Sequence, residues 1–135
     1  MDLSETRLGN MQLMNWNAGC LEIKLQSGFG SAFLDFFARV RIEHGSACAR
    51  ALRCRQTIVI EDIMADAEFN SCREIVHHAG VRAVQSTPMI SSSGALLGIV
   101  STHFPVCRQP TKMQLRNLQH TAQVAADAIV RARAC

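Results

Sequence analysis

The sequence predicts an α+β fold built on a mostly antiparallel sheet, and three observations support this prediction. Two pairs of apolar segments are each joined by a short turn, which is typical of β-hairpins. Helix-forming segments are inserted between these hairpins, as in α+β domains. The chain then closes with a long amphipathic segment, at about residues 111–134, which can cover one face of the sheet.

The first hairpin occupies residues 8–26. Residues 8–16 are mostly apolar, and residues 17–19, Asn-Ala-Gly, supply a turn. The return strand alternates apolar and polar residues, which is typical of a strand buried on one face. Its apolar positions are Leu21, Ile23 and Leu25.

Three helices and a short strand are predicted in the middle of the chain. The predicted helices span residues 31–40, 47–55 and 71–78, and the strand spans residues 57–60. On the first helix, Phe33, Phe36 and Phe37 share one face. Gly80 ends the third helix, because glycine adopts the left-handed conformation found just beyond many helices.

The second hairpin spans residues 80–104 and turns at Ser92-Ser93-Gly94. Alternate residues of a strand share a face, so Ser86, Ser101 and His103 lie together on one side of the hairpin. Buried hydroxyl and imidazole groups need hydrogen-bond partners. We therefore expect these three side chains either to bond within the protein or to face a cavity with a polar ligand or ordered water.

The last helix has the clearest periodicity. Thr111 and Gln114 form a capping box at its start. Apolar residues then recur at alternating spacings of three and four, which is a short heptad seam. Such a seam serves equally for packing on the same chain and for a homodimer. Its residues are Leu115, Leu118, Ala122, Ala125 and Ile129.

The composition limits the classes of function. The chain has 135 residues, enough for one domain, and 48% of them are hydrophobic, which argues against disorder. Its formal charge of +3 comes with no run of basic residues, so nucleic-acid binding is not expected. No apolar stretch reaches the roughly 18 residues of a membrane-spanning helix, and no signal-peptide pattern opens the chain. We expect a cytoplasmic protein without membrane insertion.

No residue pattern indicates catalysis or a metal site. The sequence contains no phosphate-binding loop, GxSxG or HExxH motif. Its six cysteines include no CxxC pair, so zinc is not indicated and reduced thiols are expected. Asp62, Asp66 and Glu68 lack the EF-hand pattern, and we expect them in a solvated acidic loop. His77 and His78 are adjacent and point to different faces of their helix.

Several stretches of the chain resemble the GAF domain family in residues, order and spacing. They are LGNMQLMNWNAGCLEIKLQSGF, HGSACARAL, IVIEDIMADAEF, GVRAVQSTPMISSSGALLGIVSTHF and VAADAIVRA. The resemblance is greatest to GAF domains of bacterial multi-domain sensors, which often stand beside PAS domains and histidine kinases. It implies one GAF domain over residues 1–135, in which the helix before the first strand is short.

The resemblance also implies where a ligand would bind. GAF domains carry a five- to six-stranded antiparallel sheet with terminal helices on one face and a ligand pocket on the other. Phytochrome-type members line that pocket with a serine and a histidine at the spacings of Ser86 and His103. The expected pocket has a floor of Ser86, Ser101 and His103, closed from the insertions by Phe33, Phe37, Cys48 and Ile63.

The familiar GAF ligands and chemistry are not expected here. Bilin-binding members carry a Cys-His pair where this chain has Ser71 and Cys72, so cysteine stands one place out of register. The NKxnFxxxDE pattern of cyclic-nucleotide-binding members is absent. Free methionine sulfoxide reductases resemble this chain near Cys48, but no cysteine lies between Ala79 and Cys107, where their catalytic thiol belongs.

The sequence and the resemblance together predict a non-catalytic domain that senses a small molecule. It would belong to, or derive from, a bacterial signal-transduction protein such as a sensor histidine kinase. The alternatives are a dimerisation module with a vestigial pocket, a thiol-redox sensor, and an enzyme of the methionine sulfoxide reductase kind. The identity of the ligand is left open.

Overall fold

The computed structural model describes residues 8–133, apart from the side chains of residues 8, 27 and 70–72. The segment expected to hold a short N-terminal helix lies outside these residues. Six strands form one sheet in the order β3-β2-β1-β6-β5-β4, with antiparallel neighbours throughout. The strands are β1 (Leu8–Asn15), β2 (Cys20–Ser27), β3 (Arg39–Arg41), β4 (Ile58–Ile60), β5 (Ala83–Ile90) and β6 (Leu96–Phe104).

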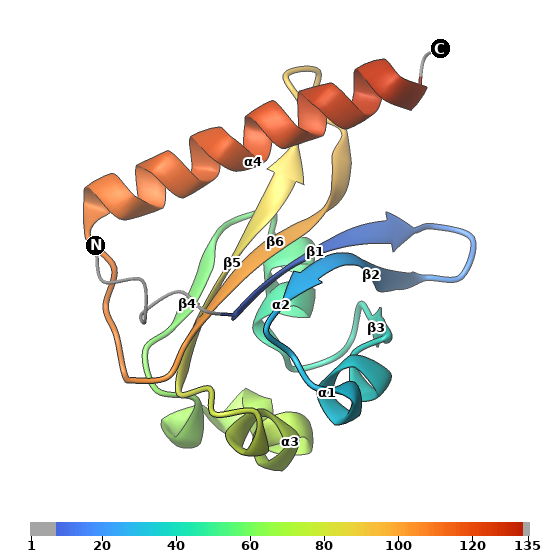
Figure 1. Ribbon diagram of the computed structural model, residues 1–135. Coiled ribbons are helices and arrows are strands. Elements are labelled where there is room, and N and C mark those ends of the chain that lie inside the picture. The colour runs from blue at the N-terminus through green and yellow to red at the C-terminus, as the bar shows by residue number, and fades with distance from the viewer. Residues whose placement is uncertain (1–7, 134–135) are drawn as a thin grey trace.

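Over residues 8–133, four α-helices and two short 3₁₀ helices accompany the sheet. They are α1 (Ser31–Phe36), α2 (Ala47–Cys54), η2 (Ile63–Ala65), η3 (Ala67–Cys72), α3 (Arg73–His78) and α4 (Lys112–Arg133). In Figure 1, α4 crosses one face of the sheet while α2 lies behind it, and α1 and α3 lie on the side away from α4. The helix α4 packs mainly on β5, and α2 packs on β4, β5 and β6. The predicted α+β fold, with the terminal helix and the inserted helices on opposite faces, is confirmed.

The first helix is shorter than predicted. It ends at Phe36, and Arg39–Arg41 instead form β3, which pairs with Cys20–Glu22 of β2. This pairing places Val40 opposite Leu21, and both side chains are buried. The three phenylalanines form one group of ring contacts, in which Phe33 and Phe37 are buried and Phe36, at its outer edge, is 42% exposed. Pairing along the edge of β2 therefore overrides the helical pattern of residues 37–40.

The third helix begins later than predicted. Residues 67–72 form η3, and α3 starts only at Arg73. The carboxylate of Asp66 accepts a hydrogen bond from the Phe69 backbone N–H and so caps η3. Side-chain capping at Asp66 and Asp62 gives this segment its tight turns in place of an open loop.

The larger hydrophobic core lies between the sheet and the inserted helices. Leu21 and Ile99 enter it from the sheet, and Leu52, Ile63 and Val76 enter it from the insertions. A smaller cluster on the opposite face packs Met89 and Leu97 against Ala122 and Ala126 of α4. No helix of the described chain is both long and apolar enough to cross a membrane.

Candidate functional site

A small cavity lies between the sheet and the inserted helices, beside the larger core. Its volume is about 20 Å³, enough for about one water molecule. Strands β1, β5 and β6 form its floor. The residues of α1 and α2 and their ends form one side, and η3 and α3 cover it. The cavity is therefore enclosed by elements far apart in the sequence.

The structure brings six of the seven predicted site residues to this cavity. The lining includes Ser86, Ser101, His103, Phe33, Phe37 and Cys48. The seventh, Ile63, does not line it and is buried in the adjoining hydrophobic core, where its backbone N–H donates to the Arg82 carbonyl. The side chains of Ser71 and Cys72, which the bilin comparison concerns, lie outside the described residues. That the six lining residues bind a ligand stays a prediction.

Strand register sets a row of polar side chains across the cavity floor. Asn10 of β1 is the register partner of Ser101 on β6, and Ser101 is the register partner of Ser86 on β5. Directly opposed residues of neighbouring strands point to the same face. All three side chains therefore face the cavity, and the Oγ atoms of Ser86 and Ser101 lie 2.7 Å apart in a buried hydrogen bond.

His103 lies at the end of this floor and is neutral. Its ring meets Phe29 and Phe33 edge to face, with centroid separations of 5.0 and 5.9 Å. Burial lowers the pKa of His103 to about 3, because the charged imidazolium is poorly solvated there. Within the described part of the chain, its Nδ1 atom has no hydrogen-bond partner.

Two amide side chains of β1, which are not among the residues predicted from the sequence, complete the polar lining. Asn10 and Gln12 are 9% and 1% exposed, and both line the cavity. Among the described residues, neither Asn10 Oδ1 nor Gln12 Oε1 has a hydrogen-bond partner. The signal was available, since Asn10 and Gln12 alternate with Met11 and Leu13, which pack toward α4.

Cys48 forms part of the wall as a protonated thiol. Its Sγ atom lies 3.2 Å from Ser46 Oγ at the start of α2. Burial raises the pKa of the Cys48 thiol, although hydrogen bonds with Ser46 and Gln12 act in the opposite direction. A thiol held in its protonated form is a poor nucleophile. Cys48 therefore contributes shape and a weak hydrogen-bonding group rather than reactivity.

Residues 63–78, which comprise η2, η3 and α3, cover the cavity, and we call them the lid segment. Phe69 and Val76 line the cavity from this segment. Arg50 of α2 donates two hydrogen bonds to the Asp66 carboxylate, at 3.1 and 3.3 Å. Arg73 also donates to the Asp66 carbonyl, at 2.6 Å. Asp66 thus joins the lid segment to α2 through the shortest of its ion pairs, and Glu68 adds longer contacts with Arg50 and Arg53 at 3.8 Å.

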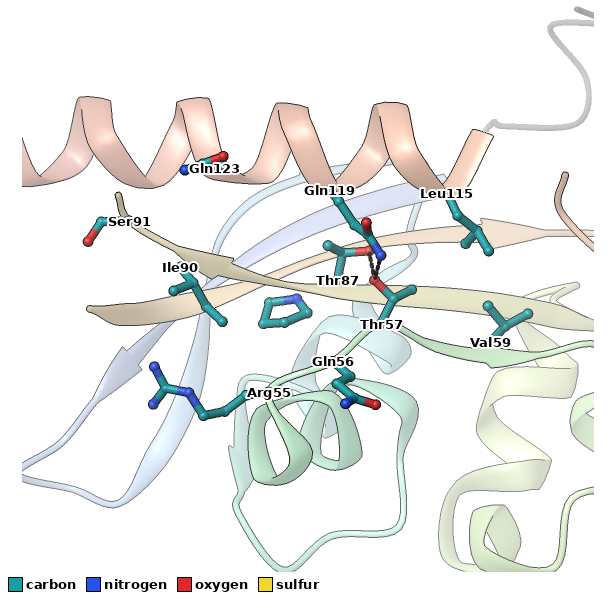
Figure 2. A pocket seen from close by; sticks show the side chains of 11 residues that line it. Arg55, Gln56, Thr57, Val59, Thr87, Ile90, Ser91, Leu115, Gln119 and Gln123 are labelled. Carbon is teal, nitrogen blue, oxygen red and sulfur yellow. Dashed lines mark hydrogen bonds between the residues drawn. The ribbon is translucent and has the colours of Figure 1, made fainter. Parts of the chain in front are cut away.

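A larger groove lies on the other face, between α4 and the edge formed by β4 and β5. Its volume is about 540 Å³, and none of the predicted site residues lines it. Figure 2 shows Gln119 reaching down from α4 toward Thr57 and Thr87. Gln119 Nε2 donates to Thr57 Oγ1 at 3.4 Å, and the Thr57 and Thr87 hydroxyls are 3.0 Å apart. Its central polar groups therefore satisfy one another, unlike those of the cavity.

The heptad seam of α4 faces the sheet of its own chain. Ala122 is buried, and Ala125 and Ile129 pack beside it on the sheet. Leu115 lines the groove, and Leu118 is half-buried. The carboxylate of Asp127 accepts hydrogen bonds from the Ser92 backbone N–H and hydroxyl, at 2.7 and 2.6 Å. The seam is thus used for packing within the chain, and Asp127 ties α4 to the β5–β6 turn.

The acidic residues of the lid region pair with arginines. Asp62 bonds Arg82 at 3.1 Å, and Asp66 bonds Arg50. Over the described residues, no three His, Cys, Asp or Glu side chains gather as a metal site. Four cysteines with described side chains, Cys20, Cys48, Cys54 and Cys107, are free thiols.

Comparisons with known proteins place the fold in a family. The model of the GAF domain matches residues 16–129. A methyl sulfide methyltransferase-associated sensor of Methanosarcina acetivorans is 31% identical over 72 residues, which are 53% of this chain and 7% of that relative. This chain therefore resembles only a small part of that sensor.

Two solved structures illustrate how widely the fold is used. A domain assigned to a two-component sensor histidine kinase of Sinorhizobium meliloti superposes with a TM-score of 0.79, at 15% identity, over 96% of this chain and 82% of that chain. Free methionine-R-sulfoxide reductase of Neisseria meningitidis superposes with a TM-score of 0.72, at 15% identity, over 93% and 71%. At these identities the likeness concerns the fold alone. With the family model matching most of its length, the chain belongs to the GAF domain family.

Proposed function

We propose that this GAF domain is a non-catalytic sensor that binds a small molecule in the cavity beneath the lid segment. The observation that carries the proposal is that three of the seven unpartnered buried side-chain atoms of the described residues belong to residues lining this cavity: Asn10 Oδ1, Gln12 Oε1 and His103 Nδ1. Each unsatisfied buried group costs about 1–3 kcal/mol. All three residues line one cavity, so one bound molecule can supply the missing partners.

A route from the cavity to α4 supports a regulatory role. Ser86 faces the cavity, and Met89 on the same strand packs against Ala122 and Ala126 of α4. The hydrogen bonds from Ser92 to Asp127 join the end of this hairpin to α4. A ligand that shifts β5 or β6 would therefore alter the packing of α4, which would carry the signal out of the domain.

The cysteine arrangement supports the non-catalytic part of the proposal. The sequence has no cysteine between Ala79 and Cys107, where the resemblance to the reductases would place the catalytic thiol. The cysteine that does line the cavity, Cys48, has a raised pKa and is buried. A thiol-redox role needs an accessible thiolate, and Cys48 offers neither property.

The relatives support a place in signal transduction. The similar protein from Methanosarcina acetivorans is a sensor, and a structurally similar domain is assigned to a sensor histidine kinase. We therefore propose that this domain works within a bacterial signalling protein in the cytoplasm, with any kinase activity in another domain.

A dimerisation module is the second candidate function. In this role, α4 helices of two chains would meet along Leu115, Leu118, Ala122, Ala125 and Ile129. The half-buried state of Leu115 and Leu118 favours it, whereas the packing of Ala122, Ala125 and Ile129 on the sheet weighs against it. In sedimentation experiments, a Leu118→Glu variant would lose self-association if this candidate is correct.

Melting temperatures across a panel of small metabolites test the sensor proposal. We compare wild type with His103→Ala, which alters the cavity, and with His120→Ala on the exposed side of α4 as a matched control. The proposal expects at least one compound to raise the melting temperature of wild type and of the control but not of His103→Ala. A panel without any His103-dependent shift would refute it.

A further inference from the structure

The chemistry of the cavity lining limits the kind of molecule that it can bind. Asn10 Oδ1 and Gln12 Oε1 are amide carbonyl oxygens, which accept hydrogen bonds and cannot donate them. Both residues come from β1, two positions apart on the same face, and both line the cavity. A ligand that satisfies both oxygens must therefore donate at least two hydrogen bonds.

The lining also carries no formal charge. Among the described residues, no Asp, Glu, Lys or Arg side chain lines the cavity. His103 is neutral because burial lowers its pKa to about 3. An ion taken into this cavity would lose its hydration without gaining a counter-charge, which is strongly unfavourable. The binding of an anion or a cation is therefore disfavoured on the same physical ground.

Most of the remaining lining is apolar and aromatic, and Ser46 and Cys48, which contact each other, add a small polar part. The rings of Phe33 and Phe37 lie tilted against each other on one side, with centroids 4.5 Å apart, and Phe69 and Val76 of the lid segment cover the other side. These surfaces suit a small carbon group and offer no further strong acceptor. The ligand thus combines a donor-rich end toward β1 with a small apolar end toward the phenylalanines.

We infer that the cavity selects a small, uncharged molecule with two hydrogen-bond donors on one group, such as a primary carboxamide. Its NH₂ group donates to the side-chain oxygens of Asn10 and Gln12. This inference rests on the proposed sensor function of the same cavity. The volume of about 20 Å³ accommodates one water-sized group. A carboxamide therefore enters only when the lid segment moves outward.

Acetamide and two charged molecules of similar size test this selectivity. The ¹⁵N-labelled protein is titrated with acetamide, acetate and ethylammonium at constant ionic strength, and backbone amide shifts are followed by NMR. We expect saturable shifts with acetamide in residues 10–12 and 101–103, and no saturable shift there with either ion. Gln12→Leu keeps the approximate size of the side chain but removes the acceptor, and should weaken acetamide binding about threefold to tenfold.

Two further variants keep the test decisive. Gln56→Leu, an exposed glutamine in the groove beside α4, should leave acetamide affinity unchanged. If Gln12→Leu does not fold, as judged by circular dichroism, Asn10→Ala takes its place with the same expected loss.

Three outcomes overturn the inference. The first is that acetate or ethylammonium binds at the cavity as tightly as acetamide. The second is that the affinity for acetamide survives both Gln12→Leu and Asn10→Ala. The third is that acetamide gives no saturable shift, which leaves the cavity to water alone. The first outcome corrects the ligand class and leaves the sensor proposal standing. The sensor proposal fails separately, when no compound of the metabolite panel acts through His103.

Discussion

The hydroxyls of Ser86 and Ser101 form a buried hydrogen bond 2.7 Å long across β5 and β6, at the centre of the cavity floor. The two residues are register partners, 15 positions apart in sequence, and are 0% and 3% exposed. Neither hydroxyl can reach bulk water, so each depends on the other or on an occupant of the cavity.

The losses in stability caused by removing each hydroxyl alone should add up to more than the loss caused by removing both together. Ser86→Ala leaves the Ser101 hydroxyl buried without its partner, at a cost of about 1–3 kcal/mol in the free energy of unfolding. The double variant Ser86→Ala/Ser101→Ala removes both groups together. Urea unfolding of the four proteins of this cycle gives the coupling energy, and strictly additive losses would contradict the dependence of each hydroxyl on the other.

The stability of the domain should fall as the pH drops from 6.5 toward 4. His103 has a pKa of about 3 in the folded state and near 6.5 when unfolded, so the unfolded chain binds more protons in this window. The contribution of His103 to the free energy of unfolding is therefore complete above pH 6.5. It is lost as the pH falls, by up to about 1.4 kcal/mol per pH unit. Urea unfolding at several pH values measures the slope.

Replacing His103, the histidine of the cavity, should reduce the pH dependence of the stability. His103→Gln should flatten the slope between pH 6.5 and 4, while His120→Gln, on the exposed side of α4, should retain it. Part of the slope will persist in His103→Gln, because burial also lowers the pKa of His44. Equal slopes in wild type and His103→Gln would mean that His103 is not held neutral by burial.

Loss of the Asp66 carboxylate should loosen the lid segment selectively. Asp66 accepts from Arg50 and from the Phe69 N–H, so Asp66→Ala removes both an ion pair and a cap. We expect a loss of about 1–2 kcal/mol and faster amide hydrogen exchange in residues 66–76 than in β5 and β6. Glu68→Ala is the control, because the Glu68 side chain is 63% exposed and its contacts with Arg50 and Arg53 are 3.8 Å long.

Two glycines on adjacent strands should differ sharply in their tolerance of alanine. A Cβ atom at Gly98 on β6 would overlap the backbone carbonyl oxygen of Gln12 on β1. A Cβ atom at Gly9 would meet the Ser101 carbonyl oxygen at 3.5 Å, an ordinary contact. Gly98→Ala should therefore cost about 3 kcal/mol and Gly9→Ala less than about 1 kcal/mol, as measured by thermal unfolding. Similar losses would show that β1 and β6 are not packed this closely.

The cysteines should differ in reactivity according to exposure. Cys54 and Cys107 are exposed, whereas Cys20 and Cys48 are buried. Brief treatment of the folded protein with iodoacetamide, followed by peptide mass spectrometry, should modify the exposed pair first. Modification of Cys48 as fast as Cys54 would instead favour the thiol-redox alternative.

Much of the site could be predicted from the second hairpin, because its side chains alternate regularly between the two faces of the sheet around Ser86, Ser101 and His103. Ser86, Ser101 and His103 have the predicted parity and line the cavity together. The same alternation in β1 would have indicated Asn10 and Gln12, but polar residues in a first hairpin are equally typical of a solvated face. Only the pairing of Asn10 with Ser101 distinguishes the two possibilities.

The elements that differ from prediction depend on contacts between distant residues. Helical spacing favours a helix through residue 40, but the free edge of β2 pairs with Arg39–Arg41 and ends α1 at Phe36. The expected pocket is closed from the insertions by Ile63 among others, but the Ile63 backbone N–H donates to the Arg82 carbonyl and its side chain lies in the core beside the cavity. Such tertiary hydrogen bonds leave no local trace in the sequence.

A crystal structure of the domain with the best compound of the metabolite panel would show directly whether the cavity beneath the lid segment holds a ligand. We expect electron density for that compound in the cavity, within hydrogen-bond distance of Asn10 Oδ1 and Gln12 Oε1, with the lid segment displaced outward. Density for a single water there, with the compound bound elsewhere on the domain, would contradict this expectation.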